Sequence, residues 1–109
     1  MQSLLPKQQF SQRRMALMQW MGSDPIAIIP AALQYIRNRD ADFRYRQDSD
    51  FYYLSGFAEP DAVICIIPNR PQGEFILFCR EKDREREIWD GYRAGVEGAI
   101  ELFGADDSY

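Results

Sequence analysis

The distribution of apolar and polar residues predicts a helix at the start of the chain. Between Pro6 and Met21, apolar residues recur every three or four positions, which is typical of one buried helical face. This stripe comprises Phe10, Arg14, Leu17, Met18 and Met21. Arg14 interrupts the stripe, although its alkyl stem can lie along apolar surface. Trp20 falls off the stripe, so we expect it at the edge of the core or against a partner.

Three short apolar runs predict strands: Ile26–Ile29, Ala62–Ile67 and Phe75–Cys79. The last two do not alternate with polar residues, so we expect both of their faces to be covered, as in an α/β fold. A short link rich in turn residues joins them and favours antiparallel pairing. The sequence therefore predicts a mixed β-sheet flanked by helices. Residues 106–109 are expected to lead into a further strand.

Two more helices are expected. In the first, Asp48 or Ser49 caps the N-terminus, Phe51 and Leu54 share one helical face, and Gly56 ends the helix. The second spans Ala94–Phe103 and has one apolar face. Gly104 follows directly and ends the helix. That face is predicted to comprise Val96, Ile100 and Phe103. The residues from Ala31 to Arg37 fit no single prediction, and Asn38–Phe43 reads as a loop.

The two cysteines lie in the two central apolar runs. If these runs pair as a hairpin, Cys65 faces approximately residue 76 and not Cys79, which disfavours a disulfide. We therefore expect two buried thiols that pack as small apolar side chains.

Composition excludes several classes of function. The chain has 109 residues, which suits one small domain, and its formal net charge of −4 offers no basic surface for nucleic acid. No apolar run is long enough to cross a membrane. The chain contains no His, so neither a Ser-His-Asp triad nor a two-His zinc site can be built from it. We expect a cytoplasmic protein.

A long motif in the middle of the chain resembles a known family. It reads Tyr-Arg-Gln-Asp-Ser-Asp-Phe-Tyr-Tyr-Leu-Ser-Gly-Phe-x-Glu-Pro-x-Ala and begins at Tyr45. This wording is similar to the N-terminal domain of bacterial aminopeptidase P, the Xaa-Pro aminopeptidase of the creatinase/prolidase family. The likeness extends to Glu87-Ile88-Trp89-x-Gly91-x-Arg93 and to Arg13-Arg14 in the first helix. Within the motif, we expect Tyr45, Tyr52 and Tyr53 to bury their rings and Arg46 to pair with a carboxylate.

The resemblance implies a parent enzyme with two domains, of which only the second is catalytic. Residues 1–109 would form the N-terminal domain, incomplete at its C-terminal end, and the catalytic "pita-bread" domain would be absent from this chain. In the family, that second domain holds two metal ions, usually Mn²⁺, and the enzyme removes an N-terminal residue that precedes proline. This chain alone is thus expected to be inactive, and its carboxylates are expected to have structural roles.

The resemblance also implies partners and two site residues. The partners are the chain's own catalytic domain, proline-containing peptides and, in a tetramer, further copies of the enzyme. Trp89 matches a family position at the substrate cleft, and Asp40 matches one offered to a neighbouring subunit's site. From the residues alone, Trp89 could equally pack in the core, and Asp40 could be a solvated carboxylate. An alternative function is a stand-alone protein-binding module derived from the same fold.

Overall fold

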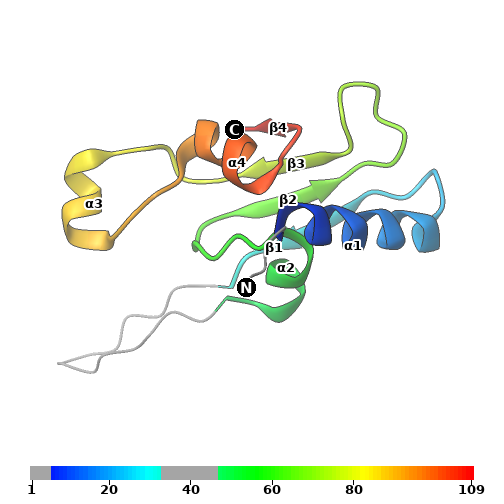
Figure 1. Ribbon diagram of the computed structural model, residues 1–109, viewed down its shortest axis with the longest axis horizontal. Helices are drawn as coiled ribbons and strands as arrows, with labels where there is room; N and C mark the ends of the chain where they lie inside the picture. The colour runs from blue at the N-terminus through cyan, green and yellow to red at the C-terminus, as the bar shows by residue number, and fades with distance from the viewer. Residues whose placement is uncertain (1–5, 33–46) are drawn as a thin grey trace.

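The computed structural model describes residues 6–32 and 47–109. The elements follow in the order α1 (Pro6–Met21), β1 (Ala27–Pro30), α2 (Ser49–Ser55), β2 (Val63–Ile66), β3 (Phe75–Phe78), α3 (Arg84–Asp90), α4 (Gly95–Phe103) and β4 (Asp107–Ser108). In this part of the chain the strands form one sheet in the order β1-β2-β3-β4 (Figure 1). The first two pairings are antiparallel and the third is parallel. The predicted mixed sheet with flanking helices is confirmed.

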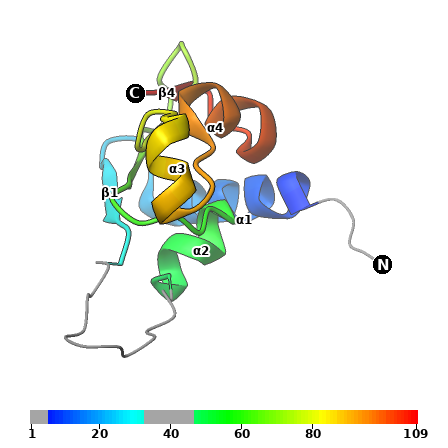
Figure 2. The ribbon, with the colours of Figure 1, turned by 90° about the vertical axis from the view of Figure 1, so that its left-hand side faces the viewer.

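The sheet is covered on one face. Helices α1, α2 and α4 lie on the same side of the strands (Figure 2). Side chains from both layers form the core, and the strands contribute Ile64, Ile66, Phe75 and Leu77 to it. On the opposite face the register aligns Ile28, Cys65 and Ile76, and Ile28 is 66% exposed. Within β2 and β3, however, Ile76 on this face is buried and Cys65 is half-buried, whereas Phe78 is 40% exposed. The expectation that both faces of these two strands are covered is therefore met only in part, because the three packed helices share one side.

Helix α2 forms as its capping residues predict. The Asp48 carboxylate accepts a hydrogen bond from the Phe51 N–H at 3.0 Å, and Gly56 ends the helix with a φ of 72°. Phe51 and Leu54 are buried. The expected burial of the two described tyrosine rings is wrong. Tyr52 and Tyr53 are exposed, because the short helix turns only one face to the core. Tyr45 and Arg46 lie outside the described residues.

Helix α1 buries the charged group of Arg14, whereas only the alkyl stem of this side chain was expected to lie along apolar surface. The stripe lies toward the core as predicted, but the Arg14 guanidinium is itself buried. It donates to the Leu54 carbonyl at 2.8 Å and lies 3.8 Å from the centre of the Phe75 ring. Burial lowers the pKa of Arg14 to about 10, and Asp106 partly offsets this shift. Arg14 thereby joins α1 to α2 and to the sheet.

Helix α4 packs through its small residues. Gly95 and Ala99 are buried, and Phe103 meets the Phe57 ring edge-on at 4.9 Å between ring centres. Val96 and Ile100 are exposed, so the predicted apolar face of this helix is wrong apart from Phe103. Small side chains allow the helix to approach the core closely, and the larger residues occupy the outer face.

The hairpin of β2 and β3 has the predicted register. Cys65 lies opposite Ile76, one of the pairs that also align Val63 with Phe78. Both thiols are free, and they are half-buried and not fully buried as expected. In the described segments, no helix has both the length and the apolar content to cross a membrane.

Candidate functional site

The segment between β3 and α4 projects away from the sheet and carries α3. Its helix lies beyond the end of the strands (Figure 1). The chain turns into α3 at Asp83, whose carboxylate accepts from the Arg86 N–H at 3.1 Å, and leaves it at Gly91. Because α3 packs extensively on no other described helix or strand, its end caps take the place of tertiary contacts in stabilising it. We call residues 81–93 the α3 segment.

Trp89 lies on the outer surface of the α3 segment. Its side chain is 86% exposed, and the neighbouring Ile88 and Tyr92 are exposed as well. Trp89 therefore does not pack in the core formed by the described residues of this chain. Three large apolar side chains on one short segment form a surface suited to contact with another molecule.

The two ends of the α3 segment are tied together by Lys82 and Glu87. The Lys82 ammonium donates to Glu87 Oε1 at 3.1 Å and to the Arg93 carbonyl at 2.7 Å. The Arg93 N–H donates to the same Glu87 oxygen at 3.2 Å. The N–H of Arg93, reinforced by the Lys82 ammonium, lowers the pKa of Glu87 below its ordinary value. Glu87 therefore acts as a charged acceptor that closes the segment.

Glu59 joins the base of the α3 segment to the rest of the fold. One carboxylate oxygen accepts from the Ala94 N–H at 2.8 Å, and the other lies 3.3 Å from Arg80 Nη2. The side chains of Glu59 and Arg80 are each only 14% exposed. Residues 80 and 94 flank the segment, so one carboxylate holds both of its ends. The sequence marked Glu59 as part of the motif but gave it no partner.

The second predicted site residue, Asp40, lies outside the described residues. Its role therefore stays a prediction.

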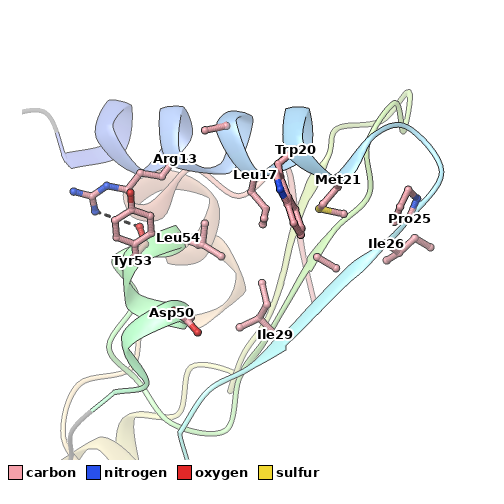
Figure 3. Close-up of a pocket in the computed structure, with 12 residues that line it drawn as sticks. Arg13, Leu17, Trp20, Met21, Pro25, Ile26, Ile29, Asp50, Tyr53 and Leu54 are labelled. Atoms are coloured by element: carbon pink, nitrogen blue, oxygen red, sulfur yellow. Dashed lines mark hydrogen bonds between the residues drawn. The ribbon is translucent and has the colours of Figure 1, made fainter.

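A groove that sequence reasoning missed lies between α1, β1 and α2 (Figure 3). Its volume is about 630 Å³, and its lining includes Leu17, Trp20, Ile26 and Leu54. Trp20 is 85% exposed, so its expected place at the edge of the core is wrong. At the rim, Arg13 donates to the Tyr53 carbonyl at 3.2 Å. Trp20 off the helical stripe and Ile26 directly after a proline were the signals in the sequence.

The donor set of the described residues does not fit the two metal ions that the family resemblance implies. The whole sequence lacks His. Among residues 6–32 and 47–109, no three Cys, Asp or Glu side chains come together in a way that could hold a metal ion. Glu59 and Glu87 are occupied by nearby N–H groups and cations. We therefore assign no metal chemistry to these residues.

Comparison with protein families gives a match over nearly the whole chain. The sequence model described as "Aminopeptidase P, N-terminal domain" matches residues 10–109. Among curated proteins, the Xaa-Pro aminopeptidase of Escherichia coli K12 is 40% identical over 105 residues, which are 95% of this chain and 24% of that protein. Xaa-Pro aminopeptidase 3 of Homo sapiens is 37% identical over 92 residues, 81% of this chain and 18% of that protein.

Solved structures match the fold as well. The aminopeptidase PepP of Pseudomonas aeruginosa superposes with a TM-score of 0.90 at 59% identity and covers 96% of this chain. The zinc-substituted E. coli aminopeptidase P in complex with product gives a TM-score of 0.86 at 39% identity, over 98% of this chain. In both cases the match spans 24% of the solved chain. This chain thus covers about a quarter of the length of these relatives.

Proposed function

Because this chain belongs to the family of aminopeptidase P N-terminal domains, we propose that it is the non-catalytic N-terminal domain of a metal-dependent Xaa-Pro aminopeptidase. The observation that carries the proposal is the family match over residues 10–109. The relatives named as Xaa-Pro aminopeptidases are hydrolases, and each is several times longer than this chain. The parent enzyme would act in the cytoplasm and remove an N-terminal residue that precedes proline.

In this proposal the chemistry belongs to the rest of the parent enzyme. Two Mn²⁺ ions in a catalytic domain would supply an activated hydroxide and stabilise the developing negative charge. The residues of this chain would contribute binding surface, and the chain alone would be inactive. The N-terminal domain would help to form a homo-oligomer, a tetramer in the parent, and would line the entrance to the active sites. Asp40 would face the site of a neighbouring subunit.

Trp89 is the residue that we propose to contact a proline-containing peptide. Its indole is exposed on a projecting helix, and a pyrrolidine ring offers an apolar surface without an N–H group. Contact between the two rings would remove apolar surface from water and favour substrate binding. The α3 segment would thus form part of the wall of the substrate entrance.

The test is Trp89→Ala in the full-length enzyme, with Trp20→Ala as the matched control. The two indoles are almost equally exposed, at 86% and 85%, but only Trp89 lies on the α3 segment. Trp89→Ala should lower kcat/KM for an Xaa-Pro peptide by about 1–3 kcal/mol, or about 5- to 150-fold, with an unchanged Tm. Trp20→Ala should leave kcat/KM unchanged. Unchanged kcat/KM in Trp89→Ala would refute the substrate contact.

A second candidate function, a stand-alone protein-binding module, is favoured by the groove beside Trp20. An apolar groove with a large exposed ring at its edge is a feature of binding surfaces. The two functions differ in whether this chain is attached to a catalytic domain. A module would be expressed without a catalytic domain, whereas an enzyme part would be continuous with one, and the mass of the protein purified from its native source distinguishes them.

A further inference from the structure

We propose that Glu59 is a positioning residue that sets where the α3 segment, and with it Trp89, is held relative to the sheet. The segment leaves the sheet after β3 and returns at α4. Because α3 packs extensively on no other described element, its direction depends on its two ends. Glu59 is the described side chain outside the segment that contacts both ends, through Arg80 and the Ala94 N–H.

The surroundings of Glu59 make this contact strong. A carboxylate that receives hydrogen bonds from a guanidinium and a backbone N–H binds more tightly when water is excluded, and both side chains of the pair are largely buried. The backbone of Glu59 is fixed in turn, because Gln47 Nε2 donates to its carbonyl at 2.9 Å. Pro60 follows and is buried. Glu59 is therefore held by the fold on one side and holds the segment on the other.

Within the segment, Lys82 and Glu87 transmit this position to α3. Lys82 joins Glu87 of the helix to the carbonyl of Arg93, the residue before Ala94. The Lys82 ammonium also lies 4.2 Å from the centre of the Tyr92 ring. These contacts hold the segment together as one unit, so its direction is set at its base. Loss of the Glu59 contact would change the orientation of Trp89 without touching its ring.

The first experiment measures amide hydrogen exchange by NMR in this chain. Glu59→Gln keeps the size of the side chain and removes its charge, and Asp61→Asn makes the same change at an exposed carboxylate two residues away. In Glu59→Gln, the Ala94 and Arg93 amides should exchange about tenfold faster, while those of Ile64 and Ile66 in β2 should keep their rates. Asp61→Asn should alter neither group. Unchanged exchange at Ala94, or equal acceleration in β2, overturns the proposal.

A second variant approaches the same contact from the other side. Arg80→Gln removes the cation and leaves Glu59 free to accept from Ala94, so it should accelerate exchange at Arg93 less than Glu59→Gln does. This variant decides the question if Glu59→Gln does not fold. No acceleration in a folded Arg80→Gln would then overturn the role of the ion pair.

The second experiment concerns the parent enzyme and rests on the proposed function. Glu59→Gln should raise KM for an Xaa-Pro peptide about three- to tenfold with little change in kcat. Because Glu59 acts through Trp89, the double variant Glu59→Gln/Trp89→Ala should be no worse than Trp89→Ala. Additive losses overturn the positioning role. If Trp89→Ala has no effect by itself, the proposed substrate contact of Trp89 fails, and the exchange experiment still decides whether Glu59 positions the segment.

Discussion

Gly56 shows how one residue serves two contacts. It ends α2 in the left-handed conformation, and a Cβ at this position would collide with the ring of Phe10 in α1. Gly22, after α1, also has a positive φ, of 91°, but no atom lies within 4 Å of its Cβ position. Both glycines thus need a positive φ, but only Gly56 is also packed against a neighbouring side chain.

Replacement of these glycines by alanine should separate the two effects. Gly22→Ala should lower the free energy of unfolding by about 1–2 kcal/mol, the usual cost of a left-handed conformation. Gly56→Ala should lower it by about 2–5 kcal/mol, because overpacking against Phe10 adds about 1–3 kcal/mol. Chemical denaturation of both variants gives the comparison. Equal losses would mean that the Phe10 ring moves aside at no cost.

At the scale of residues, the sequence predicted those positions whose role is local. The cap at Asp48 or Ser49, the stop at Gly56 and the shared face of Phe51 and Leu54 follow from neighbours within one turn. Burial that depends on other segments was not predictable. Tyr52 and Tyr53 are exposed, and the Arg14 guanidinium is buried, because the orientation of α1 against α2 decides both. Glu59 contacts Arg80 and Ala94, which lie 21 and 35 residues further along the chain. Contacts between such distant residues leave no periodic pattern in the sequence.

At the scale of elements, α3 depends on a charged carboxylate. The pKa of Glu87 is lowered in the folded chain, so its contribution to stability is present above the pKa of the unfolded chain. That contribution is lost as the pH falls through the lower folded pKa. The difference in unfolding free energy between the wild type and Glu87→Gln should therefore be present at pH 7 and absent at pH 2. Chemical denaturation at both values measures it, and a difference that persists at pH 2 would contradict the role of the carboxylate.

The elements were predictable where local pattern and packing agree. The β2–β3 hairpin and its register followed from a short link between two apolar runs. Helix α4 was predicted in place but with the wrong buried face, because the pattern of large apolar residues marked Val96 and Ile100. Gly95 and Ala99 take the inner positions instead, and small residues give no apolar signal of their own. The groove beside Trp20 is completed by α2, which is distant in sequence from α1 and β1, so Trp20 and Ile26 signalled exposed apolar residues but not the groove itself.

At the scale of the whole molecule, the two faces of the sheet differ. Three helices cover one face, and the other presents apolar residues to water. On this open face Ile28 and Phe78 are exposed, Val63 and Cys65 are half-buried and Ile76 is buried. Tyr109 stacks on Phe78 with 5.5 Å between ring centres. Strand β1 is also an edge of the described sheet. Exposed apolar surface beside a free strand edge favours association with another chain.

We therefore expect this chain to self-associate through the open face of the sheet. Ile28→Lys places a charge on that face in the edge strand, which should oppose pairing between copies. Ile26→Lys is the matched control, because Ile26 is 56% exposed but lines the groove on the side of α1. Sedimentation velocity over a range of concentrations should show association of the wild type and of Ile26→Lys, and a monomer for Ile28→Lys. If Ile26→Lys loses the association and Ile28→Lys keeps it, the contact lies in the groove and not on the open face. A wild-type chain that is monomeric at every concentration would refute the expected self-association.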